Sequence, residues 1–197
     1  IGLHLETLSL NNFIIDPKNS AAQQEVKKLK EALLGEGFFL LIDHGIENEI
    51  IDKAYEQSET FHNLDDDDPR KQATHYRYAH FGRGWSPCGE EPAYSAGTKA
   101  TCSAFDMCYE IAEVDTEHEN YGPNLWPLEM PEYQEAVYDY YLKFSELEQK
   151  VANAIEEALG LDKDHITSKM TEKSPSTMRL IFYPPVKEKP EDNLFGI

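Results

Sequence analysis

Residues 35–46 read GEGFFLLIDHGI, and this stretch decides how the first part of the chain folds. Its apolar centre, residues 38–42, lies between glycines and is too short for an ordinary helix. Such a run is typical of a strand that is buried on both faces. His44 follows in a turn, where we expect its ring to bond to local backbone and not to a metal. The stretch therefore predicts a buried strand followed by a turn.

Helices are predicted on both sides of this strand. Upstream, residues 20–33 begin with a Ser-x-x-Gln capping box and repeat apolar side chains every three or four positions. Downstream, residues 48–61 carry a second such stripe. It ends before the aspartates 65–68, which lack the alternating ligands, the glycine and the distal glutamate of a calcium loop. We interpret these aspartates as a solvated helix end.

A third, much longer helix is predicted from Pro131 to Gly160. Proline suits the first position of a helix, and the apolar stripe that follows alternates steps of four and three up to Ala158. At about 1.5 Å per residue, this helix is roughly 40 Å long.

Residues 70–130, in contrast, are rich in Gly, Pro, Ser and Thr and show no clean period, which indicates loops and short elements.

The segment 176–183, STMRLIFY, alternates along its length and is predicted to be a strand. One face carries Met178, Leu180 and Phe182, and the other carries Thr177, Arg179, Ile181 and Tyr183. The first face is a core face. The second is either an ordinary solvent face or the lining of a polar pocket, and the pattern alone favours the solvent face.

The composition limits the kinds of partner. Lys and Arg number 18 against 37 Asp and Glu, and the resulting net charge of −19 repels nucleic acids and anionic membrane surfaces. No apolar run approaches the roughly 18 residues of a membrane span. The three cysteines lack zinc-site spacing, and we expect Cys102 and Cys108 to be small buried side chains. These features predict a soluble cytoplasmic protein that binds neither nucleic acid nor membranes.

A search for chemistry finds no catalytic constellation. An iron site of two histidines and one carboxylate can begin with a His-x-Asp or His-x-Glu pair on a strand. Only His4-Leu5-Glu6 has this form, and we interpret it as a chance match. Nucleotide-binding and serine-hydrolase motifs are missing, so we predict no catalytic residue and no metal ligand in this chain. The remaining histidines are expected to be exposed: His62, His75, His80, His118 and His165.

Several segments nonetheless resemble, in order, the isopenicillin N synthase-like branch of the non-haem Fe(II)/2-oxoglutarate-dependent oxygenases. The segments are GEGFFLLIDHGI at 35–46, FHNLDDDDPRK at 61–71, RGWSPCGEE at 83–91, KATCSAFDMCYEI at 99–111, GPNLWP at 122–127 and MRLIFYPP at 178–185. The resemblance covers roughly residues 8–190.

The resemblance implies an α+β fold in which N-terminal helices and strands, together with a long bracing helix, lead into a distorted jelly-roll (double-stranded β-helix) barrel that is incomplete in this chain. It implies three parts: an N-terminal dioxygenase-type region at 1–125, a connecting helix at 126–172, and the first barrel strands at 173–197. In the family, inward residues of the strand that resembles 178–185 line the active site.

Carried over to this chain, the resemblance places Arg179, Ile181 and Tyr183 in the pocket, with Tyr183 as the contact for a carboxylate of co-substrate or substrate. Arg83 resembles a loop arginine that reaches the substrate in some members. The family's Fe(II) ligands and its Arg-x-Ser for 2-oxoglutarate lie downstream of such a strand. We therefore expect an oxidoreductase for a small-molecule substrate when full length, and no iron, 2-oxoglutarate or activity in these 197 residues alone.

Two alternatives remain open. The first is an oxidase of the same family that needs no 2-oxoglutarate, and the second is a non-catalytic truncated binding module. A barrel cut after its first strands leaves open hydrogen-bonding edges and uncovered apolar surface. We therefore expect the isolated chain to be poorly stable or to self-associate.

Overall fold

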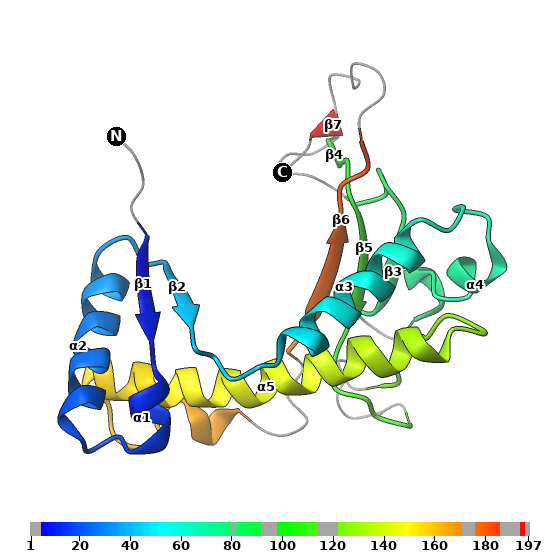
Figure 1. Cartoon of the computed structure of the whole chain (residues 1–197). Helices are drawn as coiled ribbons and strands as arrows, with labels where there is room; N and C mark the ends of the chain where they lie inside the picture. The colour runs from blue at the N-terminus through cyan, green and yellow to red at the C-terminus, as the bar shows by residue number, and fades with distance from the viewer. Residues whose placement is uncertain are drawn as a thin grey trace. The chain divides into compact units, whose positions relative to one another are not determined.

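The computed structural model describes residues 5–79, 82–91, 98–113, 122–170, 176–185 and 194–195 (Figure 1). The chain divides into two compact units, which are described separately. The first unit comprises residues 1–48 and 141–171, and the second comprises 49–140 and 172–197. Helix α5, Pro131–Leu159, contributes residues to both units. The three-part division at residues 125 and 172 stays a prediction.

The first unit is built on a small parallel sheet and the helices beside it. Strands β1 (Glu6–Ser9) and β2 (Phe39–Ile42) pair in parallel, and α1 (Asn11–Ile15) and α2 (Ser20–Leu34) lie between them in sequence. Helix α2 covers the predicted span, but its N-cap is Asn19 and not Ser20. The Asn19 Oδ1 atom accepts a hydrogen bond from the Ala22 N–H at 2.7 Å. The core of this unit consists of Leu8, Leu10, Phe13, Ala22, Val26, Leu29, Ala32, Ala154 and Ala158.

Strand β2 confirms the predicted strand but not its burial on both faces. Leu40 and Ile42 are 54% and 47% exposed, whereas Phe39 and Leu41 pack against the core. The reason is that, within the described ranges, β2 pairs with β1 alone, and residues of α2 and α5 lie in the core on one side. His44 behaves as expected, since its Nδ1 accepts a hydrogen bond from the Ile46 N–H at 3.1 Å.

The predicted helices of the second unit are confirmed. Helix α3 spans Asn48–His62, and α5 begins at Pro131 as its proline indicates. Short elements fill the region in which the sequence shows no period: α4 (Pro69–Gln72), η1 (Tyr76–Tyr78), β3 (Gly84–Ser86), β4 (Lys99–Ala100) and β5 (Ser103–Met107). The remaining elements are η2 (Thr167–Lys169), β6 (Met178–Phe182) and β7 (Leu194–Phe195).

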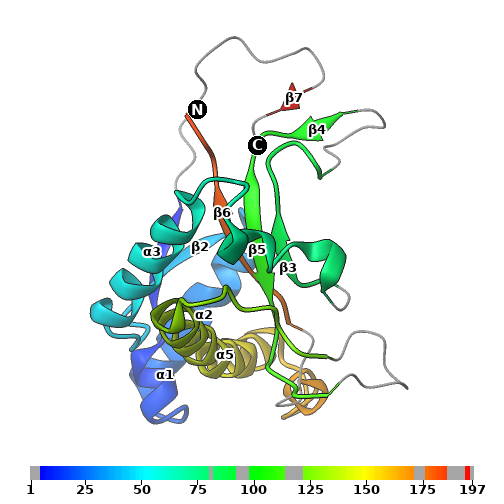
Figure 2. The ribbon, with the colours of Figure 1, turned by 90° about the vertical axis from the view of Figure 1, so that its right-hand side faces the viewer.

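An antiparallel sheet in the order β3-β5-β6 organises the second unit (Figure 2). Every residue of the central strand β5 is buried. Its inner face packs into an aromatic core, where Phe105 lies edge-on to Phe61 and Tyr133 at centroid distances of 5.4 and 5.3 Å. The opposite face, here called the outer face, carries Ala104 and Asp106 of β5 beside Ile181 and Arg179 of β6. Strands β4 and β7 form a separate parallel pair.

Candidate functional site on the outer face of the sheet

Strand β6 presents the residues that the sequence places on its second face. Its side chains alternate between partly buried and exposed, as predicted. Ile181 is 45% exposed, and Tyr183, just beyond the strand, is 46% exposed. An isoleucine and a tyrosine that share one open face can contact a ligand through apolar surface and a hydroxyl group. The structure therefore brings Arg179 and Ile181 to one face of β6 and leaves Tyr183 exposed just beyond the end of the strand.

The Arg179 side chain is already occupied by two carboxylates. Its Nε donates to Asp106 Oδ1 at 2.7 Å, and its NH2 donates to Asp106 Oδ2 at 2.5 Å. Its NH1 and NH2 donate to the two oxygens of Glu91 at 2.8 and 3.0 Å. We call these three residues the Arg179 ion-pair cluster. Most of the donors of this guanidinium are used within the chain.

The electrostatics of the Arg179 ion-pair cluster follow from its burial. Burial raises the pKa of Asp106, and hydrogen bonds and charge from Arg179 act in the opposite direction. The hydrogen bonds that Arg179 donates to Asp106, with a further contribution from Glu91, raise the pKa of Arg179 above its usual value. With one cation between two anions, this end of the outer face is not positively charged.

Arg83 lies elsewhere. It directly precedes β3, the strand at the other edge of the sheet, and its side chain is only 2% exposed. The structure therefore does not bring Arg83 to the exposed side chains of β6. The next residue, Gly84, adopts φ +94° close to the Thr74 carbonyl, which fixes the backbone at this position.

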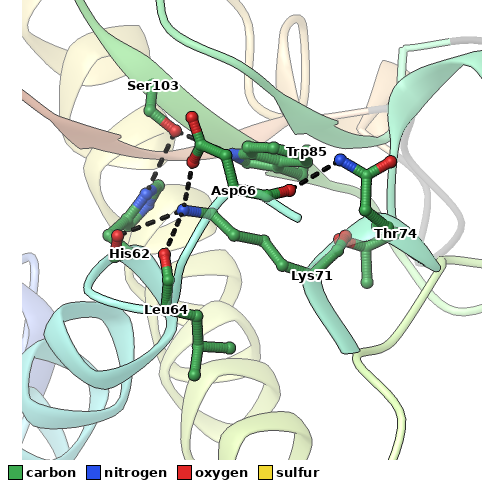
Figure 3. A network of polar contacts seen from close by, with 8 residues as sticks. His62, Leu64, Asp66, Lys71, Thr74, Trp85 and Ser103 are labelled. Atoms are coloured by element: carbon green, nitrogen blue, oxygen red, sulfur yellow. Dashed lines mark hydrogen bonds and ion pairs between the residues drawn. The ribbon is translucent and has the colours of Figure 1, made fainter. Parts of the chain in front are cut away.

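The sequence did not indicate a buried polar network that lies in the second unit around Lys71 (Figure 3). Lys71 is 2% exposed, and its Nζ donates to the carbonyls of His62 and Leu64 at 3.1 and 2.9 Å. The same Nζ forms an ion pair with Asp66 at 2.8 Å and lies 4.9 Å from the Trp85 ring centroid. A lysine within a charged run reads as solvated surface, so no local signal marks its burial.

The aspartate run is solvated, as expected, since Asp65, Asp66 and Asp67 are exposed, and two of its members also have specific partners. Asp66 binds the buried Lys71, and the Asp68 side chain accepts from the Arg70 N–H at 2.9 Å as the N-cap of α4. An aspartate that directly precedes a proline, as Asp68 precedes Pro69, is a recognisable signal for the start of a helix. The run therefore ends one helix and begins the next.

Two of the histidines expected to be exposed are buried. His62 is 5% exposed, and its ring stacks on Phe182 at a centroid distance of 5.4 Å. The Ser103 hydroxyl lies 3.3 Å from His62 Nδ1 and accepts a hydrogen bond from Trp85 Nε1 at 2.7 Å. His75 is 1% exposed and contacts Trp85 edge-on. His165 is exposed, as expected, and His80 and His118 lie outside the described residues.

Because His62 is buried, we expect the free energy of unfolding to fall in acid. Burial, and secondarily the charge of Lys71, lower its pKa to about 4, while the Leu180 carbonyl and Asp66 act in the opposite direction. Because the unfolded chain binds this proton near pH 6.5, the stabilisation is complete above about pH 6.5 and is lost as pH falls toward 4. We expect a loss on the order of 3 kcal/mol, measured by urea unfolding between pH 7.5 and 4. A His62→Gln variant should flatten this dependence, and an equally steep profile in the variant would contradict it.

The described residues do not fit an iron site. Within them, no group of three His, Cys, Asp or Glu side chains could hold a metal ion. His4 of the His-Leu-Glu triplet lies outside the described residues. Cys102 and Cys108 are buried, as expected, and Cys88 is exposed. No helix of the described ranges is long and apolar enough to cross a membrane.

Comparisons with known proteins agree with the fold. Residues 5–129 match the family described as the N-terminal region of non-haem dioxygenases in morphine synthesis. Azadirone synthase of Melia azedarach is 27% identical over 155 residues, which cover 76% of this chain and 46% of that protein. A homoarginine-6-hydroxylase of Arabidopsis thaliana is 30% identical over 166 residues, which cover 81% and 48%. The chain spans about half the length of the curated relatives it matches.

Solved structures share the same mixed helix and strand fold. Neurospora crassa T7H in complex with α-KG matches with a TM-score of 0.71 at 17% identity, over 93% of this chain and 55% of that chain. The rice dioxygenase for auxin oxidation matches with a TM-score of 0.65 at 19% identity, over 91% and 52%. At these identities the likeness concerns the fold alone.

Proposed function

Since the chain belongs to the family of non-haem dioxygenase N-terminal regions, we propose that it is the N-terminal part of an Fe(II)/2-oxoglutarate-dependent oxygenase that oxidises a small molecule. The observation that carries this proposal is the open face of β6, which presents Ile181 and Tyr183 beside a packed core. The relatives named as 2-oxoglutarate-dependent dioxygenases support the class of reaction.

We propose that the metal and its co-substrate are held outside these 197 residues, because the described part offers no fitting set of ligands. In this proposal the β3-β5-β6 sheet is the first part of a jelly-roll barrel that further residues complete. The activity of the whole protein then requires the longer chain, and the 197-residue chain alone is inactive.

The proposed role of this chain is to supply one wall of the substrate pocket. Ile181 gives the wall apolar surface, and the Tyr183 hydroxyl donates a hydrogen bond to a carboxylate of substrate or co-substrate. Arg179 borders the same wall through its two carboxylate partners. Arg83 is buried directly before β3 and is not part of this wall.

The test compares the full-length protein with the 197-residue chain. With Fe(II) and ascorbate, the full-length protein should release labelled CO₂ from 2-oxoglutarate, and the chain alone should release none. Tyr183→Phe should raise the KM of a ligand whose carboxylate it contacts by roughly 10- to 100-fold, because a hydrogen bond to a charged group contributes about 1.5–3 kcal/mol. Tyr78→Phe, which alters another exposed tyrosine of the second unit, is the control.

Each other outcome identifies an alternative. Oxygen consumption without CO₂ release would indicate the oxidase that needs no 2-oxoglutarate. A full-length protein with neither activity would contradict the proposal and favour a non-catalytic binding module. CO₂ release by the isolated chain would show that its own residues hold the metal.

A further inference from the structure

Among the described residues, the segment between β3 and β4 contacts the rest of the second unit through its backbone and the side chains of Glu90 and Glu91. The Gly89 N–H donates to the Ala100 carbonyl at 3.0 Å, and the Ala100 N–H donates to the Glu91 carbonyl at 3.0 Å. These bonds tie residues 87–91 to β4. Gly89 has φ +78°, which suits the turn that this pairing requires.

The Glu91 side chain ties the same segment to a different strand. Both of its oxygens accept hydrogen bonds from Arg179 of β6, which lies 88 residues away in sequence. Arg179 is fixed in turn by Asp106 of β5, whose side chain is only 10% exposed. The planar guanidinium is suited to this task, because its fork of donors can bind two carboxylates at once.

The two carboxylates of the Arg179 ion-pair cluster differ in role. Asp106 pairs with Arg179 in the register of neighbouring strands, so it fixes the plane of the guanidinium against the sheet. Glu91 lies on a segment that belongs to neither strand, and its side chain is 24% exposed. Asp106 therefore anchors the arginine, and Glu91 is the group that the arginine holds.

We propose that Arg179 is a positioning residue: it holds residues 87–91 at the border of the outer face and so sets the shape of the wall formed by Ile181 and Tyr183. This inference rests on the proposed function, in which the wall is part of a substrate pocket. Arg179 then makes its contacts within the chain, and donors other than Arg179 bind the carboxylates of the ligands. A cation between two anions offers little attraction to a third anion.

Glu91→Gln is the most selective variant, because it weakens the contact between Arg179 and residues 87–91 while the Arg179–Asp106 ion pair remains. The matched control is Asp67→Asn, which removes one negative charge from an exposed aspartate of the same unit. Cys102 can serve as a reporter, because it is 3% exposed and lies two residues after Ala100, whose backbone is bonded to Gly89 and Glu91. Cys108, 4% exposed, is the internal reference.

In the full-length protein, Glu91→Gln should speed exchange of the Gly89 and Ala100 amides by about tenfold, and labelling of Cys102 by a thiol reagent, compared at equal thiolate fraction, by a similar factor. Labelling of Cys108 should not change, and the KM for 2-oxoglutarate should stay within about twofold. Asp67→Asn should alter none of these quantities. Arg179→Lys should keep more of the protection of Cys102 and of the two amides than Arg179→Gln does, because lysine keeps one charged donor group.

Two results would overturn the inference. Unchanged labelling and exchange in Glu91→Gln would show that Arg179 does not hold the segment. A KM for 2-oxoglutarate that falls in Glu91→Gln and rises more than tenfold in Arg179→Gln would show that Arg179 binds the co-substrate. If no variant and no wild-type protein releases CO₂, the proposed function fails, while labelling and exchange still decide the role of Arg179.

Discussion

Replacing Lys71 with methionine is expected to lower the free energy of unfolding by about 3 kcal/mol, since hydrogen bonds to a charged group contribute about 1.5–3 kcal/mol each. The Lys71 ammonium donates to two carbonyls and one carboxylate, and its side chain is 2% exposed. Methionine keeps much of the volume but leaves the carbonyls of His62 and Leu64 without this donor. Urea unfolding followed by circular dichroism in the full-length protein measures the effect.

The matched control for Lys71→Met is Asp66→Asn. The Asp66 side chain is 68% exposed, so its ion pair with Lys71 is screened by solvent and should contribute less than about 1 kcal/mol. A loss of similar size in both variants would mean that the exposed ion pair, and not the two carbonyl contacts, carries the stabilisation.

Gly84→Ala is the second change expected to have a large effect, a loss of about 3 kcal/mol. A Cβ atom at this position would lie 2.5 Å from the Thr74 carbonyl oxygen, and the backbone has φ +94°. The left-handed conformation costs an L-residue about 1–2 kcal/mol, and overpacking a filled site adds about 1–3 kcal/mol. Relief by local movement would break the hydrogen bond from the Trp85 N–H to Thr74 at 2.6 Å.

Gly82→Ala separates the two contributions. Gly82 has φ +69°, and nothing lies within 4 Å of a Cβ built there, so only the conformational cost of about 1 kcal/mol remains. Both variants are compared by their urea midpoints. Equal losses at the two positions would show that contact with Thr74 is not what excludes a side chain at Gly84.

The helices could be predicted because their signals are local. Helices α2, α3 and α5 each repeat apolar residues at helical spacing, α2 follows a capping residue and α5 starts at a proline, and the structure places all three where the pattern does. Strand β5 could not be recognised in this way. It is buried on both faces yet contains Ser103 and Asp106, whose polar groups bond to Trp85 and Arg179 elsewhere in the chain.

Burial was the feature that the sequence predicted least well. The run at β2 is continuously apolar, but it has one exposed face because, in the part of the chain that the structure describes, its sheet consists of β1 and β2. His62 and Lys71 read as surface residues, and both are buried because α3 and α4 lie against the aromatic core that contains Phe61 and Trp85. A local pattern records the spacing of residues but not the number of elements that pack around them.

The sequence by itself determined the face of β6 on which Arg179 and Ile181 lie, because side chains alternate along a strand with a fixed period of two. Only the tertiary structure decided what Arg179 does there. Its partners, Asp106 and Glu91, lie 73 and 88 residues away in the chain, and no local spacing relates them. They meet because β5 pairs with β6 in one register and the segment after β3 folds back to the same arginine.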